Sequence, residues 1–282
     1  MITGRTQNLG VIGWPIAHSL SPVMQNAAIK QAGLDYNYTA LPVAPENLPA
    51  AVAGLKAVHY RGWNVTIPHK AAIMPLLDEV DEAARIIGAV NTVLNDNGRL
   101  VGYNTDYLGF MGALNSRGIE LSGKTAVLLG AGGAARAVVW GLLQAGTVEV
   151  VLAVRNPAKA QPLVEDFSPY GRVTVCHWAE ELFTEQLRKC SLLVNTTPLG
   201  MTPQVEACPP VVWEALNPKA FVYDIIYTPA QTRFLREARQ HGHEVVNGEE
   251  MLAGQGAAAL ELWTGCQPDL DCMQKALHQA LG

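Results

Sequence analysis

Three short segments within the first 106 residues collect polar side chains next to small residues and prolines. One of them holds Ser19 and Ser21, two hydroxyl groups beside a predicted helix start. Hydroxyl groups donate hydrogen bonds and the N-terminus of a helix attracts anions, so this pair suits a carboxylate ligand. We predict that Ser21 is the N-cap of this helix and that Pro22 occupies its first position.

The other two segments contain a lysine and a carboxylate. Lys70 follows Pro68, which predicts a helix from residue 68 to about residue 77 with Lys70 in its first turn. The positive end of such a helix disfavours a charged ammonium group, which suits a lysine that exchanges protons. Asp106 lies at another predicted helix start. Sequence spacing alone leaves open whether the two side chains meet.

Residues 130–135 read Gly-Ala-Gly-Gly-Ala-Ala and match the pattern GxGxxA between a predicted strand and a predicted helix. The first glycine permits a tight turn, the second lets a pyrophosphate approach the backbone, and the small sixth residue lets the helix pack on the strand. Free N–H groups at the helix start face the phosphates. The predicted cofactor-binding residues here are Gly130, Ala131, Gly132, Gly133 and Ala134.

The end of the next predicted strand bears on the choice between NAD and NADP. An NAD site usually carries an acidic residue there, but Glu149 lies at the beginning of this strand. The strand is instead followed by Arg155 and Asn156. Arg155 can pair with a 2′-phosphate, and Lys159 lies one helical turn further on. These residues favour NADP; the alternative is that Arg155 is only a solvated side chain.

The elements that must position these groups alternate between short β-branched runs and Ala/Leu-rich periodic stretches, which is typical of an α/β protein. The chain of 282 residues is long enough for two domains. The second half has a Rossmann-like, doubly wound pattern. Its predicted strands are residues 125–129, 148–154, 173–176, 192–196, 221–226 and 244–246.

We therefore predict an NADP-binding Rossmann-like domain at residues 107–248. Residues 1–106 with 249–282 form an N-terminal α/β substrate-binding and catalytic domain. Two predicted helices, 249–264 and 270–281, pack back on the first half of the chain. An active-site cleft between the two domains is expected, because the hydride donor and the substrate groups come from different halves.

Composition narrows the classes of function. Apolar residues make up 49% and the formal net charge is −5, with no basic run, so we expect a folded protein that binds neither nucleic acid nor a membrane. Five cysteines without a CxxC pair argue against a disulfide framework or a zinc site, and the histidines show no metal-like spacing. We expect no metal, a cytoplasmic location, and either a monomer or a homodimer.

Taken in order, these segments resemble the shikimate dehydrogenase family over nearly the whole chain. The family reduces 3-dehydroshikimate to shikimate with NADPH in chorismate and aromatic amino-acid biosynthesis. The matching motifs are SxSP at 19–22, NVTxPxK at 64–70, GAVNT at 88–92, GxNTD at 102–106, GAGGAxR at 130–136, NTTPLGM at 195–201 and MLxxQxA at 251–257.

The resemblance implies a role for each matching residue. Lys70 and Asp106 would form the catalytic pair, and Ile225 and Gly248 would lie against the nicotinamide. The substrate would be held by Ser19, Ser21, Thr66, Asn91, Asp106, Tyr227 and Gln255. His18 and His69 are interpreted as structural. The family's usual Asn-Arg-Thr after the second strand of the nucleotide domain reads Val-Arg-Asn at residues 154–156, which keeps the arginine but changes its neighbours.

Three other functions remain open at this point. One is a quinate/shikimate dehydrogenase that uses NAD or NADP. A second is a non-catalytic shikimate/NADP sensor, against which the Lys70 and Asp106 pair speaks. A third is a dehydrogenase of the same fold with an unrelated substrate, against which the two serines and Gln255 speak through the resemblance.

Overall fold

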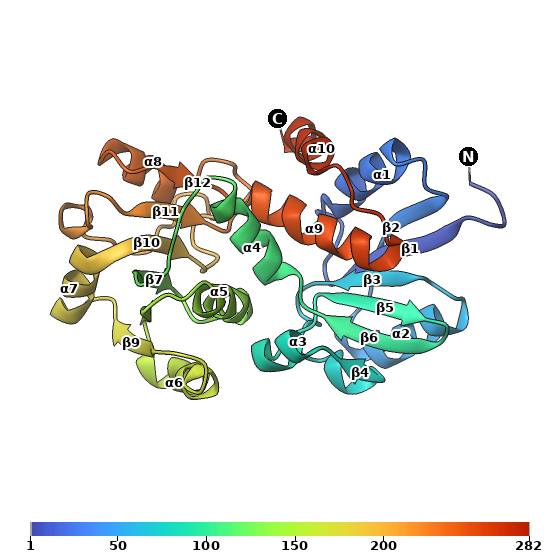
Figure 1. The fold of residues 1–282 in the computed structure, drawn as a ribbon, viewed down its shortest axis with the longest axis horizontal. Helices are drawn as coiled ribbons and strands as arrows, with labels where there is room; N and C mark the ends of the chain where they lie inside the picture. The colour runs from blue at the N-terminus through green and yellow to red at the C-terminus, as the bar shows by residue number, and fades with distance from the viewer. Residues whose placement is uncertain (1, 282) are drawn as a thin grey trace. The chain divides into compact units, whose positions relative to one another are not determined.

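The computed structural model describes residues 2–281, which form two compact units (Figure 1). The first unit comprises the chain up to Gly109 together with Leu252–Ala280. The second comprises Phe110–Met251 and Leu281. Each unit is built on a six-stranded sheet with helices packed on it.

The sheet of the first unit has the order β2-β1-β3-β5-β6-β4. Its strands are β1 (Gln7–Gly13), β2 (Tyr36–Pro42), β3 (Gly62–Val65), β4 (Glu79–Val80), β5 (Thr92–Asp96) and β6 (Arg99–Tyr103). Strand β1 pairs in parallel with β2 and β3, whereas β5 is antiparallel to β3 and β6. Strands β5 and β6 form a hairpin in which Asn97 and Gly98 both have positive φ, as a two-residue turn requires.

Helices from both ends of the chain complete the core of the first unit. The early helices are α1 (Ser21–Gln31), α2 (Leu48–Ala57), α3 (Glu82–Ile87) and α4 (Asp106–Asn115), with 3₁₀ turns η1 (Pro45–Asn47) and η2 (Met74–Leu76). The late ones, α9 (Glu249–Thr264) and α10 (Leu270–Leu281), match their predicted ranges. Trp263 of α9 and Met273 of α10 pack with Leu9 and Met24 in one buried cluster. These late helices are therefore part of the first unit's core.

The sheet of the second unit is parallel throughout, with the order β12-β11-β10-β7-β8-β9. Its strands are β7 (Thr125–Leu129), β8 (Glu149–Val154), β9 (Val173–His177), β10 (Cys190–Asn195), β11 (Phe221–Asp224) and β12 (Val245–Val246). The helices are α5 (Gly133–Gln144), α6 (Pro157–Phe167), α7 (Glu181–Lys189) and α8 (Arg233–Gln240), with a 3₁₀ turn η3 (Trp213–Ala215).

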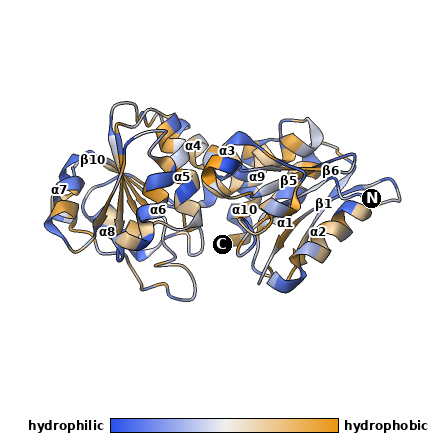
Figure 2. Ribbon diagram, turned by 90° about the horizontal axis from the view of Figure 1, so that it is seen from below, coloured by the Kyte–Doolittle hydropathy of each residue, from blue (hydrophilic) through white to orange (hydrophobic). Residues whose placement is uncertain are grey.

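All six strands predicted for the second unit are confirmed, and so is the doubly wound α/β fold. The strands are apolar, because helices cover both faces of a parallel sheet (Figure 2). The strand order changes direction at β7, which has β10 on one side and β8 on the other. Ligands of such sheets bind at the carboxyl ends of the strands beside that point.

Two local predictions are wrong. No α-helix follows Pro68; residues 67–73 form irregular turns before η2. The backbone there serves long-range contacts instead, since the Lys70 carbonyl accepts from the Val90 N–H at 2.8 Å. Ser21 is the first residue of α1 rather than its N-cap. Leu20 occupies the cap position, and the Ser19 hydroxyl accepts from the Ser21 N–H at 3.3 Å.

Among the residues that the structure describes, no helix has both the length and the apolar character needed to cross a membrane.

Candidate functional site

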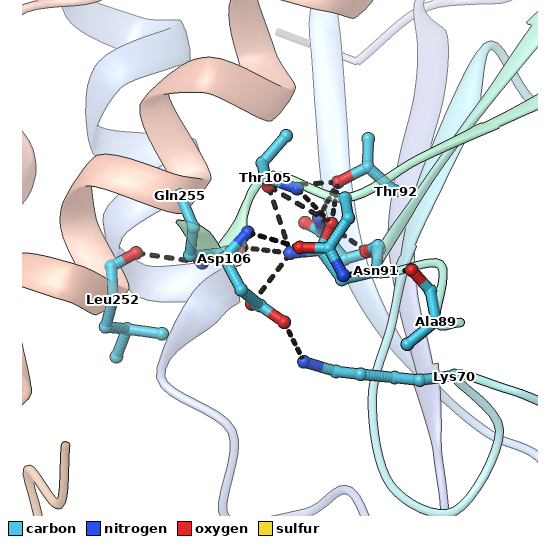
Figure 3. A network of polar contacts seen from close by, with 10 residues as sticks. Lys70, Ala89, Asn91, Thr92, Thr105, Asp106, Leu252 and Gln255 are labelled. Atoms are coloured by element: carbon cyan, nitrogen blue, oxygen red, sulfur yellow. Dashed lines mark hydrogen bonds and ion pairs between the residues drawn. The ribbon is translucent and has the colours of Figure 1, made fainter. Parts of the chain in front are cut away.

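Lys70 and Asp106 meet in the first unit although 36 residues separate them (Figure 3). Lys70 Nζ donates to Asp106 Oδ2 at 2.6 Å, and their side chains are 26% and 11% exposed. Asp106 begins α4, and its N–H donates to Asn104 Oδ1 at 3.0 Å. The pair combines a cation and a carboxylate in a largely enclosed place that retains access to solvent.

Asn91 holds the second oxygen of this carboxylate. Its Nδ2 donates to Asp106 Oδ1 at 2.8 Å and to Thr105 Oγ1 at 3.0 Å. Its Oδ1 accepts from the Thr105 N–H at 2.7 Å and from the Thr92 hydroxyl at 3.0 Å. Donors and acceptors on opposite ends fix the orientation of the amide, and the amide in turn fixes the Asp106 carboxylate.

Helix α9 brings Gln255 to the same network. Gln255 Oε1 lies 3.4 Å from Asn91 Nδ2, and its Nε2 donates to the Leu252 carbonyl at 2.8 Å. Figure 3 shows this side chain pointing from α9 toward Asn91 and Asp106. Gln25 of α1 also reaches α9, where its Nε2 donates to the Gly256 carbonyl at 2.9 Å.

The predicted carboxylate-binding hydroxyls lie at the start of α1 in the same unit. Ser21 is buried next to Tyr38, whose hydroxyl donates to Asn64 Oδ1 at 2.7 Å. Burial raises the pKa of Tyr38 well above its usual value, although a hydrogen bond with Ser21 opposes this. Thr66 directly follows β3, and its N–H donates to the Ile12 carbonyl at 3.0 Å.

In the second unit, a pocket of about 310 Å³ opens at the carboxyl ends of β7, β8 and β10. Gly130 forms its turn with φ of +106°, and a Cβ there would lie 2.8 Å from Thr197 Cγ2. Gly132 and Gly133 start α5, and a Cβ on either would meet nothing within 4 Å. The turn is therefore open on the side where a phosphate group needs to approach the backbone.

The cations predicted from the sequence line this pocket. Arg155 and Lys159 are both exposed, and Asn156 Oδ1 caps α6 by accepting from the Lys159 N–H at 3.2 Å. Glu149 lies at the other end of β8, where its Oε1 accepts from Arg172 Nε at 3.0 Å. These positions fit a nucleotide with an additional phosphate, because two cations line the pocket and the Glu149 carboxylate lies at the other end of β8.

Several pocket residues had no predicted role. They are Val154, Ala160, Trp178, Thr196, Thr197, Pro198 and Leu199. Residues 196–199 follow β10, and Thr196 Oγ1 donates to the Leu129 carbonyl at 2.9 Å. The signal that could have identified this loop is topological, because β10 and β7 flank the point where the strand order changes direction.

Ile225 and Gly248 also come together in the second unit. A Cβ on Gly248 would lie 2.1 Å from the Ile225 carbonyl oxygen, and the Gly248 N–H donates to the Ile226 carbonyl at 2.9 Å. Tyr227 follows in the same unit, and burial raises its pKa. The other predicted substrate residues and Lys70 belong to the first unit.

The two histidines beside the motifs lie in different environments. His69 is buried with Nε2 2.8 Å from the Val43 carbonyl oxygen, which is a structural contact. His18 is exposed. Within residues 2–281, no cluster of three histidine, cysteine or carboxylate side chains is arranged to hold a metal ion.

Comparisons with known proteins converge on one family. The family model described as "Shikimate dehydrogenase substrate binding domain" matches residues 11–93, and "Shikimate 5'-dehydrogenase C-terminal domain" matches residues 248–278. A curated relative, "Shikimate dehydrogenase (NADP(+))" of Desulforamulus reducens, is 44% identical, with 99% of this chain and 97% of the relative covered.

Two solved structures extend the comparison. Shikimate 5-dehydrogenase from Thermus thermophilus, in complex with NADP(H) and shikimate, is 41% identical with a TM-score of 0.88 and coverage of 98% of this chain and 100% of that one. Quinate dehydrogenase from Corynebacterium glutamicum, in complex with NAD, is 29% identical with a TM-score of 0.89 and coverage of 97% and 99%.

Proposed function

Because the chain belongs to the shikimate dehydrogenase family, we propose that it catalyses the reversible, NADP-dependent reduction of 3-dehydroshikimate to shikimate, a step in aromatic amino-acid biosynthesis. The observation that carries this proposal is the 2.6 Å contact between Lys70 Nζ and Asp106 Oδ2. The contact supports the proposal, because an ammonium group held by a carboxylate is suited to donate a proton in a fixed direction. The chain is thus an oxidoreductase that acts on a secondary alcohol.

Lys70 and Asp106 act together in the proton transfer of the reaction. Lys70 Nζ donates a proton to the substrate oxygen as the ketone becomes an alcohol, and takes it back in the reverse direction. Asp106 holds the ammonium group and accepts a hydrogen bond from a substrate hydroxyl. Asn91 supports both roles, because it keeps Asp106 Oδ1 in place from the side opposite Lys70.

The remaining polar groups bind the ring. Ser19 and Ser21 donate hydrogen bonds to the substrate carboxylate at the start of α1. The ring hydroxyls are bound by Thr66, Asn91, Asp106, Gln255 and Tyr227. Hydrogen bonds to a charged group contribute about 1.5–3 kcal/mol each, so the serines account for much of the substrate affinity.

The second unit holds NADP, which supplies the hydride when bound. The open turn at residues 130–134 binds the pyrophosphate through backbone N–H groups at the start of α5. Arg155 and Lys159 neutralise the 2′-phosphate, with Asn156 between them. Ile225 and Gly248 lie against the nicotinamide.

The deciding experiment compares kcat/KM for shikimate and quinate, each with NADP⁺ and NAD⁺, by the absorbance of the reduced cofactor. We expect the highest value for shikimate with NADP⁺. A higher value for quinate or for NAD⁺ would favour a quinate/shikimate dehydrogenase. The similarity to the Corynebacterium enzyme and the altered neighbours of Arg155 support that alternative. Folded protein that binds NADP⁺ without turnover would instead indicate a sensor.

Arg155 gives the sharpest test of cofactor choice. Arg155→Ala should raise KM for NADP⁺ by roughly 10-fold or more and leave KM for NAD⁺ nearly unchanged, because only NADP⁺ carries the 2′-phosphate. Arg172→Ala is the matched control, since Arg172 pairs with Glu149 at the opposite end of β8. An equal effect of Arg155→Ala on both cofactors would remove Arg155 from this role.

The wider setting follows from the same proposal. We assign substrate binding and catalysis to residues 1–106 with 249–282, and NADP binding to residues 107–248. The enzyme works on free small molecules in the cytoplasm, with no nucleic acid or membrane, as a monomer or a homodimer. All five cysteines are free, which suits a reducing compartment.

A further inference from the structure

Asp224 is a fully buried carboxylate at the carboxyl end of β11. Its three hydrogen-bond donors are all neutral. Asn195 Nδ2 and the Ile226 N–H donate to Oδ1 at 3.0 and 3.1 Å, and the Thr232 hydroxyl donates to Oδ2 at 2.6 Å. A buried charge that is held only by neutral donors is costly, so its presence needs a reason beyond stability.

The first connection from Asp224 runs through Asn195 to the loop that lines the nucleotide pocket. Asp224 Oδ1 accepts from the Ile226 N–H and therefore faces Asn195 as an acceptor as well, so the Asn195 amide points its NH₂ group toward Asp224. The amide oxygen then faces Thr197 and accepts from its N–H at 3.0 Å and its hydroxyl at 2.7 Å. The same NH₂ group also reaches the Leu199 carbonyl at 3.3 Å. Asp224 therefore sets the orientation of a side chain that holds both ends of residues 197–199.

This loop presses directly on the phosphate-binding turn. A Cβ on Gly130 would lie 2.8 Å from Thr197 Cγ2 and 3.0 Å from Thr196 Oγ1. The Thr196 N–H donates to the Leu129 carbonyl at 3.0 Å. A shift of the loop would displace the turn, because the side chains of Thr196 and Thr197 leave no room for even a Cβ on Gly130.

The second connection runs along the chain to the segment proposed to face the nicotinamide. The Ile226 N–H is held by Asp224, and the Ile225 N–H donates to the Asn195 carbonyl at 3.2 Å. Gly248 in turn donates to the Ile226 carbonyl. One carboxyl group thus links the loop beside the pyrophosphate-binding turn with the segment proposed to face the nicotinamide.

We propose that Asp224 is a positioning residue for NADP, which holds the 196–199 loop and the backbone of Ile225 and Ile226 in the arrangement that the cofactor binds. The inference rests on the proposed function for the identity of the cofactor. It assigns to Asp224 no contact with substrate or cofactor and no part in proton transfer.

Asp224→Asn tests this role with a side chain of the same size. The amide has one acceptor oxygen in place of two, so either the Thr232 hydroxyl loses its acceptor or the new NH₂ group faces the donors of Asn195 and Ile226. We expect KM for NADP⁺ to rise roughly 10-fold, the size of one lost hydrogen bond to a charged group, and kcat and KM for shikimate to stay within about twofold. Glu237→Gln is the matched control, because Glu237 is an acid of the same unit that accepts from Trp213 and Arg233 away from the pocket.

Thr232 provides a second pair of variants in case Asp224→Asn does not fold. Thr232→Val removes the donor to Asp224 Oδ2, whereas Thr232→Ser retains it. We expect weaker NADPH binding in Thr232→Val and recovery in Thr232→Ser, measured by calorimetry without substrate. Because this readout needs no turnover, it separates a failure of the inference from a failure of the proposed reaction.

Three results would overturn the role. One is unchanged NADPH affinity in both Asp224→Asn and Thr232→Val. Another is the same rise in KM for NADP⁺ in Glu237→Gln. The third is a rise in KM for shikimate as large as that for NADP⁺, which would indicate general loosening of the fold.

Discussion

Asp106, which begins α4, and Asp224, which ends β11, are both buried carboxylates, but their partners differ in kind. Asp106 shares one oxygen with the ammonium group of Lys70 and keeps 11% of its side chain exposed. Asp224 is fully enclosed by the neutral donors of Asn195, Thr232 and a backbone N–H. Burial raises the pKa of Asp224 to about 7, although its hydrogen bonds act in the opposite direction.

The two environments suit the two carboxylates to different tasks. A carboxylate beside a partly exposed lysine can orient a group that exchanges protons with a substrate. A carboxylate surrounded by fixed neutral donors instead orders the backbone segments that supply those donors. In our proposal, the first unit therefore uses an aspartate for chemistry and the second unit uses one for geometry.

Removal of Lys70 should have the largest effect of the variants considered. Lys70→Ala should lower kcat by about 10²–10⁴-fold, the usual contribution of a general acid–base group, with a much smaller change in KM for shikimate. Steady-state kinetics in the direction of shikimate oxidation measures both. Turnover near that of the wild type would leave Asp106 without the chemical role assigned to it.

A matched lysine in the same unit supplies the control. Lys56 pairs with Asp78 at 3.0 Å, and both side chains are well exposed. Lys56→Ala should therefore leave kcat unchanged, because exposed ion pairs contribute little and this one lies outside the site.

The same amide substitution at Asp106 and at Asp224 should have different effects on kcat. Asp106→Asn should lower kcat by roughly 10²-fold, because the ammonium group of Lys70 loses its orienting partner. Asp224→Asn should leave kcat in place and change only the KM for NADP⁺. Equal losses of kcat in the two variants would show that both carboxylates serve the same purpose.

The smallest expected effect is on stability as a function of pH. Since the pKa of Asp224 is about 7 in the folded protein and near 3.8 in its usual range, the folded state binds more protons between these values. The contribution of Asp224 to the free energy of unfolding is therefore fully present below about pH 4 and is lost as the pH rises through about 7.

Denaturant unfolding of the wild type and Asp224→Asn tests this sign. Between about pH 5 and about pH 8, the stability of the wild type relative to the variant should fall by on the order of 1–3 kcal/mol. A difference that stays constant, or that grows with pH, would mean that this carboxylate is ionised at much lower pH than its burial implies.

Much of the fold could be predicted because local pattern and tertiary structure agree in the second unit. Each buried parallel strand is a short apolar run between periodic helices, and GxGxxA marks the turn after β7. The hairpin around Asn97 and Gly98 is also encoded locally, since its turn needs residues that tolerate positive φ.

The segment after Pro68 shows where local pattern fails. Proline is generally preferred at a helix start. Here, however, the Lys70 carbonyl accepts a hydrogen bond from the Val90 N–H, and the His69 imidazole contacts the Val43 carbonyl. Such long-range contacts override propensity and leave no trace in sequence spacing. For the same reason the meeting of Lys70 and Asp106 was expected only through the family resemblance.

The network around Asp224 could not be predicted at all. Asn195 lies within a motif that the family resemblance singled out, but nothing local connects it with a residue 29 positions away. Adjacent parallel strands bring the two together, because Asn195 and Asp224 are paired in the register of β10 and β11. Strand register is a property of the folded sheet rather than of either segment.

The composition of the first unit's core has a consequence for the order of events during synthesis. Leu9 and Met24 leave the ribosome before the second unit, whereas Trp263 and Met273, which pack with them, leave after it. The intervening second unit, Phe110–Met251, takes roughly 7–30 s to translate at about 5–20 residues per second. During that interval the apolar residues of β1 and α1 lack the partners that α9 and α10 later supply, so this core can close only after the second unit has been synthesised.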